Sequence, residues 1–177
     1  MAQQSQHHNP ALTSLEGLVG EWEMELSQTS FLPDPSDTIK GPVLIEWEQD
    51  GAFLLMCMGD KQPGPPQALW RISRDDATPT YTVLYYDARS VSRVYAMSFS
   101  DGVWKMWRGS SGFWQRYEGT VSDDGKTITG HCIEANVYLT HEGQERIDPP
   151  LKKSYTCVYL RHKGGSHDKE WHHSYNT

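Results

Sequence analysis

Two groups of residues in this sequence carry side chains that could do chemistry. The first group is Arg93, Tyr95 and Arg108. Arg93 and Tyr95 are two positions apart, so they lie on one face if their segment is a strand. Guanidinium and phenol groups together bind an anion such as a carboxylate or a phenolate, because charge-assisted hydrogen bonds are strong. The alternative is that both arginines lie at a rim, with their stems packed and their heads in water.

The second group is Gln115, Tyr117 and His131. An imidazole titrates near neutral pH, so a histidine beside a tyrosine can move protons. His131 and Tyr117 are therefore the candidate catalytic residues. The alternative is a hydrogen-bonded interior histidine that orients a ligand or completes the core. The predicted strand register brings no carboxylate to the imidazole and pairs no serine or cysteine nucleophile with it.

The cysteines and the other histidines give little support to metal chemistry. Cys57, Cys132 and Cys157 are widely spaced and form no CxxC pair, which argues against a disulfide framework and against a cysteine metal site. Several histidines lie in terminal segments or are isolated: His7, His8, His141, His162, His172 and His173. No structured metal site is expected. The unpaired cysteines lead us to expect a reducing, cytoplasmic location.

The elements that must position these side chains are short runs with period-2 alternation, separated by Gly, Asp and Pro, as in all-β proteins. Ten strands are predicted at 19–28, 41–49, 52–58, 67–73, 80–86, 91–100, 103–109, 112–122, 126–135 and 151–161, after a short helix at 12–18. Mostly short connections favour one up-and-down antiparallel β-barrel. The predicted domain spans 12–161, between a flexible tail at 1–11 and a polar tail at 162–177. The longer connections, 29–40 and 136–150, are predicted to be a flap over one barrel mouth and a polar loop.

Turn chemistry predicts the register of the strands. Asp50-Gly51 and Asp101-Gly102 lie between alternating runs, the strongest short hairpin signal. The first turn pairs Val43 with Met58, Ile45 with Met56 and Trp47 with Leu54; the second pairs Tyr95 with Arg108, Met97 with Met106 and Phe99 with Trp104. A three-residue loop at 123–125 then puts His131 opposite Tyr117 and Ile133 opposite Gln115. The predicted ligand-binding face contains Met56, Met58, Arg93, Tyr95, Met97, Trp104, Arg108, Phe113, Gln115, Tyr117 and His131.

Composition excludes several classes of partner. The formal net charge is -7 and no basic stripe is longer than Lys152-Lys153, so no nucleic-acid partner is expected. The longest apolar run, 52–58, is far shorter than the roughly 20 residues of a membrane-spanning helix, so no membrane partner is expected. Residues 1–10 do not have the pattern of a signal peptide. A homodimer is compatible with the sequence.

The segment Leu15-Glu-Gly-Leu-Val-Gly20-Glu-Trp22 resembles the Leu-x-Gly-x-Trp opening of calycins, the group that includes lipocalins, fatty-acid-binding proteins and nitrobindins. Over residues 12–161 the chain is most similar to uncharacterised bacterial lipocalin-like domains. The resemblance implies that Trp22 plugs one barrel end and that Arg161, from the last strand, lies across it. A guanidinium can stack on an indole while its donors satisfy nearby carbonyls, so both residues are expected to be structural.

Nitrobindins are similar barrels that hold ferric haem through a histidine on the last strand. Here Ser154 stands about where that ligand would be, and His162 follows Arg161. This departure disfavours haem, and no cofactor is expected.

Taken together, these patterns predict a barrel that binds a small, mainly apolar ligand, with an acidic or phenolic group near the arginines. The inward methionines would suit such a ligand because methionine adapts its shape. The alternative is a cofactor-independent enzyme of the isomerase, cyclase or decarboxylase type, using tyrosine, histidine and arginine inside the barrel. A nitrobindin-like haem protein is a lower alternative.

Overall fold

The computed structural model of the chain describes residues 8–28, 34, 36–48, 51–59, 67–74, 77–110, 113–139, 145–147 and 153–162, and structural statements below refer to these. The elements are η1 (Pro10–Leu18), β1 (Gly20–Ser27), β2 (Ile39–Glu48), β3 (Phe53–Met58), β4 (Ala68–Arg74), β5 (Tyr81–Asp87), β6 (Ser92–Ser100), β7 (Val103–Ser110), β8 (Phe113–Val121), β9 (Thr127–Leu139), β10 (Glu145–Ile147) and β11 (Lys153–Arg161). Half of the predicted flap at 29–40 and most of both predicted tails lie outside the described residues.

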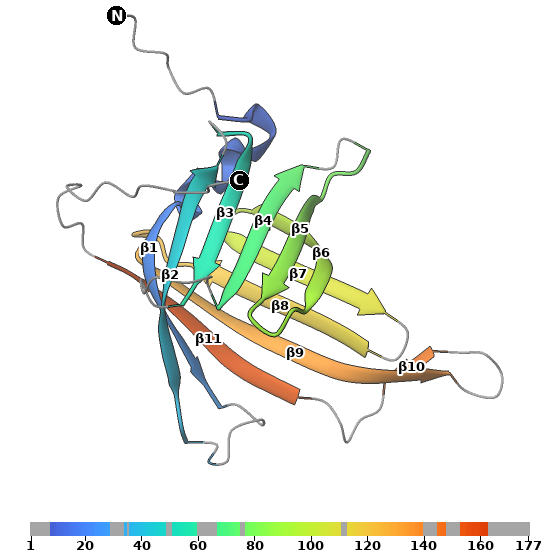
Figure 1. The fold of residues 1–177 in the computed structure, drawn as a ribbon. Coiled ribbons are helices and arrows are strands. Elements are labelled where there is room, and N and C mark those ends of the chain that lie inside the picture. Colours follow the sequence, from blue (N-terminus) through green and yellow to red (C-terminus); the bar gives the residue numbers. More distant parts are fainter. Residues whose placement is uncertain are drawn as a thin grey trace, which may run out of the picture.

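The strands form an antiparallel up-and-down barrel, as the sequence predicted. Neighbouring strands follow the order β11-β1-β2-β3-β4-β5-β6-β7-β8, and β9 pairs with both β8 and β11 to close the ring of ten strands (Figure 1). The region 136–150 differs from the predicted polar loop, because β9 extends to Leu139 and the short β10 pairs with that extension. No helix in the described part of the chain is long and apolar enough to cross a membrane.

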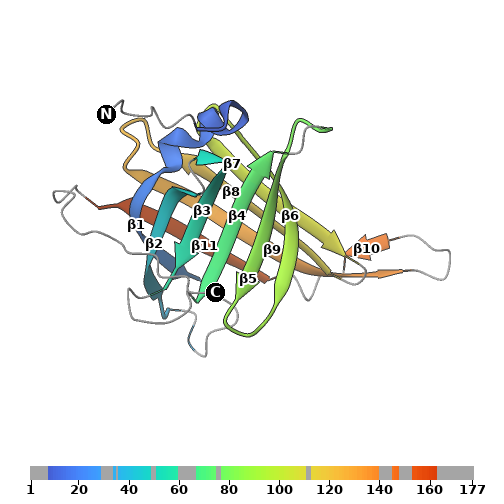
Figure 2. The same cartoon turned by 45° about the horizontal axis from the view of Figure 1, so that its top comes forward.

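The single helix of the described chain is a 3₁₀ helix that closes one end of the barrel. It begins at Pro10, two residues before the predicted start, because the Asn9 side chain accepts a hydrogen bond from the Ala11 N–H and caps it. Its buried residues, Leu12, Leu15 and Leu18, are three apart, which places them on one face of a helix with three residues per turn. In both views η1 lies at the opposite end of the barrel from the turn between β5 and β6 (Figure 2).

Trp22 and Arg161 make the contacts that the resemblance implied. Trp22 is fully buried, and its Nε1 donates to the Leu18 carbonyl over 2.9 Å. The Arg161 guanidinium lies 4.2 Å from the centroid of the Trp22 ring. It donates to the carbonyls of Val19 (2.8 Å) and Gly125 (3.0 Å), and to that of Gly17. This cluster joins η1, β1, the β8–β9 turn and the end of β11.

The half of the barrel next to η1 is filled by apolar side chains. The predicted pairs Val43–Met58, Ile45–Met56 and Trp47–Leu54 in the β2–β3 hairpin, and Met97–Met106 and Phe99–Trp104 in the β6–β7 hairpin, are present. The predicted pair Tyr95–Arg108 is not, because the β6–β7 ladder begins at Ala96–Trp107. The core of this half contains the leucines of η1 together with Trp22, Ile45, Leu54, Ile72, Val83, Met97 and Ile128. Burial on this scale is the main source of stability in such a barrel.

Candidate functional site

The half of the barrel away from η1 contains a cavity of about 690 Å³. Its wall includes the strand ends opposite η1, such as Leu26 of β1, Met58 of β3 and Asp87 of β5. The apolar and aromatic wall consists of Met24, Leu26, Ile39, Met56, Met58, Ala68, Trp70, Tyr85, Ala88, Tyr95, Trp104, Met106, Tyr117, Cys132, Tyr155, Cys157 and Tyr159; the polar and charged residues are Gln67, Asp87, Arg89, Arg93, Gln115 and Glu134. A concave, mainly apolar space with a few polar groups is the usual form of a small-molecule site.

Most of the residues predicted to bind a ligand lie on this wall. The cavity contacts Met56, Met58, Arg93, Tyr95, Trp104, Gln115 and Tyr117. Met97 instead belongs to the filled half, where it is fully buried between Tyr81 and Met106 of the adjacent strands. Arg108 and Phe113 lie outside the cavity wall.

Arg108 matches the alternative prediction, in which the stem of the side chain is packed and the guanidinium lies at a rim. Its guanidinium lies 5.8 Å from the centroid of the Tyr95 ring and 5.5 Å from that of Phe113. It also donates to Ser110 Oγ over 3.2 Å, in an exposed contact. Arg108 therefore supports the outer side of Tyr95 through cation–π contacts and leaves Arg93 as the arginine of β6 and β7 at the cavity.

The prediction that His131 faces the interior is wrong. The β8–β9 loop holds four residues, 123–126, so Ser122 faces Thr127, where the Ser122 N–H donates to the Thr127 carbonyl over 2.8 Å. Ser122 Oγ in turn accepts from the Thr127 N–H over 3.0 Å. The predicted three-residue loop was one residue too short, and such a slip exchanges the two faces of a strand. His131 is opposite Glu118, is exposed, and lies 3.3 Å from Thr156 Oγ1 through Nδ1.

The same shift turns two unpredicted residues of β9 toward the interior. Cys132 is opposite Tyr117 and Glu134 is opposite Gln115, where Ile133 was expected. Ile133 is opposite Arg116 and faces outward with His131. Counting Lys126 as part of the loop would have revealed both from the sequence. The cavity wall therefore holds the Cys132 thiol where the sequence predicted an imidazole, and the Glu134 carboxylate where it predicted an isoleucine.

Tyr117 lies on the cavity wall, but it lacks the partner that proton transfer would require. An added Cβ at Gly119 would come within 2.2 Å of its hydroxyl, and one at Gly130 within 2.7 Å. These paired glycines of β8 and β9 thus leave the space that the phenol fills. The hydroxyl is buried without a hydrogen-bond partner among the described residues, and burial raises the pKa of Tyr117 far above its ordinary value. These contacts favour a packing role for Tyr117.

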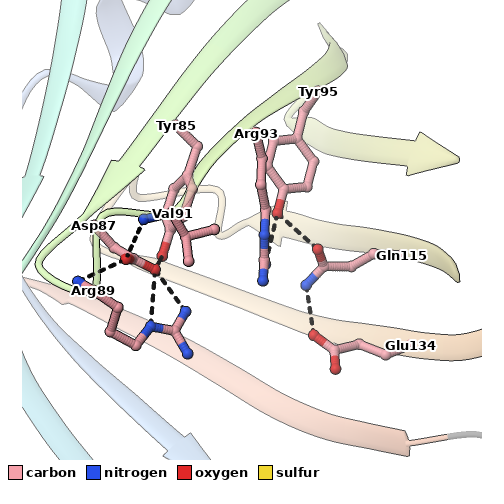
Figure 3. A network of polar contacts seen from close by, with 8 residues as sticks. All are labelled: Tyr85, Asp87, Arg89, Val91, Arg93, Tyr95, Gln115 and Glu134. Carbon is pink, nitrogen blue, oxygen red and sulfur yellow. Dashed lines mark hydrogen bonds and ion pairs between the residues drawn. The ribbon is translucent and has the colours of Figure 1, made fainter. Parts of the chain in front are cut away.

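A chain of polar contacts crosses the cavity wall from β6 to β9 (Figure 3). Arg93 Nη1 lies 3.4 Å from Tyr95 Oη, which donates to Gln115 Oε1 over 2.7 Å. Gln115 Nε2 then donates to Glu134 Oε1 over 2.6 Å. The alternation of strand side chains brings Arg93 and Tyr95 onto one face, and the β7 and β8 registers place Gln115 beside them. Arg93 also lies 5.6 Å from the centroid of the Tyr85 ring.

A second cluster, around Asp87, organises the turn between β5 and β6 (Figure 3). Asp87 accepts the N–H groups of Arg89 (2.9 Å) and Val91 (3.2 Å), the Tyr85 hydroxyl (2.9 Å) and the Arg89 guanidinium (2.6 Å). The Arg89 guanidinium holds the pKa of Asp87 well below its usual range. Burial, helped by the hydrogen bond to Asp87, raises the pKa of Tyr85 to about 12. Asp87 is therefore a neutralised turn residue, and its charge is already matched by Arg89.

The three cysteines are free thiols, and their surroundings make them unreactive. Burial raises the pKa of Cys157 to about 12 and also raises that of Cys132. Cys57, on the outer face, has its pKa raised to about 11 by burial and by the charge of Glu46. A thiolate is the reactive form of cysteine, so none of these residues is a suitable nucleophile. Within the described ranges, no three His, Cys, Asp or Glu side chains gather as a metal site.

Comparison with known proteins gives a likeness of fold. No protein-family model matches the chain, and no curated protein matches it. Among solved structures, the chain is similar to the crystal structure of Rv2717c from M. tuberculosis, with a TM-score of 0.50 and 13% sequence identity. The match covers 89% of this chain and all of that one. At this identity the likeness shows the fold alone, an antiparallel β-barrel spanning most of the chain.

Proposed function

We propose that this chain is a calycin-like barrel that binds a small, mainly apolar ligand with one acidic or phenolic group. The observation that carries the proposal is the 690 Å³ cavity with Arg93 on its wall. The volume lies within the roughly 300–1,000 Å³ of small-molecule sites. Methionines from β1, β3 and β7 line the cavity beside aromatic rings, and methionine adapts to ligands of irregular shape.

The charge of Arg93 supports an acidic ligand. Within the described part of the chain no carboxylate forms an ion pair with Arg93, whereas Arg89 and Arg71 each have one. Arg93 instead contacts the Tyr85 ring and the Tyr95 hydroxyl, which leaves most of its five N–H donors for another group. A partly buried guanidinium is stabilised when an anion meets it, so an acid bound here would gain a charge-assisted contact.

A cofactor-independent enzyme of the isomerase, cyclase or decarboxylase type is the second candidate. The observation that favours it is the Glu134 carboxylate on the cavity wall, because a carboxylate beside a bound ligand can act as a general base. His131 faces outward and takes no part in this version of the hypothesis. Turnover of a bound acid, followed by mass spectrometry, would distinguish the enzyme from the binding protein.

Haem remains the third and weakest candidate. No histidine is among the described residues that line the cavity, and β11 turns Tyr155, Cys157 and Tyr159 toward it while Ser154 is exposed. The side chains present therefore do not fit the histidine ligation of nitrobindins. We retain the expectations of a cytoplasmic location and of no nucleic-acid partner as parts of this proposal.

The proposal is tested by comparing an acid with its neutral analogue. We expect 4-phenylbutanoic acid to bind more tightly than 4-phenylbutanamide in isothermal titration calorimetry. Arg93→Met should weaken the acid about tenfold or more and leave the amide nearly unchanged, because a hydrogen bond to a charged group contributes about 1.5–3 kcal/mol. Arg116→Met is the control, since Arg116 is exposed on the outer face of β8.

Two results would contradict the proposal. One is equal affinity of the wild-type barrel for the acid and the amide. The other is an Arg93→Met variant that binds the acid as tightly as the Arg116→Met control does.

A further inference from the structure

Glu134 is the one carboxylate of the described cavity wall that forms no ion pair with the side chains that the structure describes; that of Lys153, its Cα partner on β11, lies outside them. The only other carboxylate of the described cavity wall is Asp87, which Arg89 neutralises. Glu134 Oε1 accepts the amide of Gln115 over 2.6 Å. No described residue hydrogen-bonds its second oxygen. A carboxylate oxygen accepts hydrogen bonds and donates none when ionised, so this oxygen offers a place for a donor.

The orientation of Gln115 is determined by its two neighbours. Tyr95 donates its hydroxyl hydrogen to Gln115 Oε1, and the amide nitrogen of Gln115 therefore points at Glu134. Gln115 is buried, with only 9% of its surface exposed, so this orientation is held by packing as well as by hydrogen bonds. Glu134 is thereby held as an acceptor at one end of the chain, while Arg93 supplies donors at the other (Figure 3).

The charges at the two ends of this chain of polar contacts, Arg93 and Glu134, are opposite in sign. Beyond the Asp87–Arg89 pair, the described wall carries the positive Arg93 and the negative Glu134. An anion would be attracted to Arg93 and repelled by Glu134, so the acidic group and the second polar group of a ligand must occupy different ends. The Tyr95 ring lies between Arg93 and the Gln115–Glu134 pair, and the rings of Tyr85 and Trp70 continue the wall past Arg93, packing edge to face.

We propose, building on the binding function above, that the ligand is an aromatic acid that also carries a hydrogen-bond donor such as a hydroxyl. Its acidic group meets Arg93, its ring lies against the aromatic wall, and its hydroxyl donates to Glu134. Glu134 is then a specificity-determining residue, because a ligand without the donor leaves that carboxylate without its second partner.

The test uses two probes that differ only at the donor, 4-(4-hydroxyphenyl)butanoic acid and its 4-methoxy analogue. The flexible butanoate chain allows both ends to be reached. We expect the hydroxy acid to bind the wild-type barrel about tenfold more tightly, as expected for a hydrogen bond to a charged acceptor. Glu134→Gln should reduce that preference to about twofold or less while still accepting the Gln115 amide. Glu118→Gln, an exposed carboxylate of β8, should leave the preference unchanged.

The wild-type comparison stands whether or not Glu134→Gln folds, and circular dichroism melting of both variants checks that they do. Equal affinity of the wild-type barrel for the two probes overturns the inference. So does a preference that survives in Glu134→Gln. If 4-phenylbutanoic acid binds more tightly than its amide while the hydroxy and methoxy acids bind equally, the inference alone fails. If none of the acids binds, the proposed function fails with it.

Discussion

Trp22→Ala is expected to destabilise the barrel strongly. The indole is fully buried at the closed end, and truncating a large aromatic residue in a core costs about 3–5 kcal/mol. The change also removes the donor to the Leu18 carbonyl and the ring beneath Arg161, so a value near the upper end is expected. In a chain of this length each kcal/mol lowers Tm by roughly 2–4 °C, so a fall of about 10 °C or more should follow.

The assay is urea unfolding followed by circular dichroism, with a thermal melt on the same samples. Trp107→Ala is the matched control, because Trp107 lies on the outer face of β7 between Ala96 and Arg116 and should cost much less. A Trp22→Ala variant that melts within a degree of the parent, or no lower than Trp107→Ala, would refute the role of Trp22 as the plug of the closed barrel end.

Three further predictions test other parts of the structure. Gly119→Ala should lower the free energy of unfolding by about 1–3 kcal/mol, because the new Cβ would lie 2.2 Å from the Tyr117 hydroxyl. Gly41→Ala is the control, because a Cβ there would meet nothing within 4 Å and should not share this steric cost. Equal urea midpoints for the two variants would be inconsistent with this packing. The pKa of Asp87 is lowered from 3.8, so the ionised carboxylate stabilises the fold above that pH, and this stabilisation is lost progressively as the pH falls below it. The difference between the urea midpoints of the parent and Asp87→Asn should therefore narrow as the pH falls from 6 to 3. A constant difference would exclude this linkage. Mixing with hemin should give no tight, stoichiometric Soret band, and a band abolished by changing one histidine would show that haem was wrongly disfavoured.

The fold could be predicted from the sequence because its signals are local. Asp-Gly turns and period-2 alternation placed the β2–β3 and β6–β7 pairs correctly, and the ten predicted strands match observed strands within a few residues at most ends. The strand β10 was missed because its pairing partner is an extension of β9 beyond the barrel wall, which leaves little hydrophobic pattern to read.

The candidate site was predicted only in part, and the reason is the β8–β9 loop. Asp124 accepts hydrogen bonds from Ser122 Oγ and the Lys126 N–H, which stabilises a four-residue loop that residue types alone did not distinguish from a three-residue one. One residue of difference moved His131 to the surface and brought Glu134 to the cavity. Errors of this kind accumulate along a chain of hairpins, whereas Arg93 and Tyr95 needed only the alternation of a single strand.

The separation of Arg93 from Arg108 has a different cause. Both were predicted on one face, but the cavity occupies only the half of the barrel away from η1, and its extent depends on which side chains fill the space between the strands. Arg108 stacks on Tyr95 and Phe113 instead of lining that space. The face of a strand on which a side chain lies is therefore predictable from alternation. Whether that side chain reaches a cavity depends on how the barrel interior is packed.

Native mass spectrometry of the protein purified from its own host tests the central claim most directly. We expect one small acidic molecule to accompany each chain, and we expect it to be lost from Met58→Trp, in which a larger side chain occupies part of the cavity wall. A spectrum with the bare chain alone, or an adduct that Met58→Trp retains in full, would contradict binding inside the barrel.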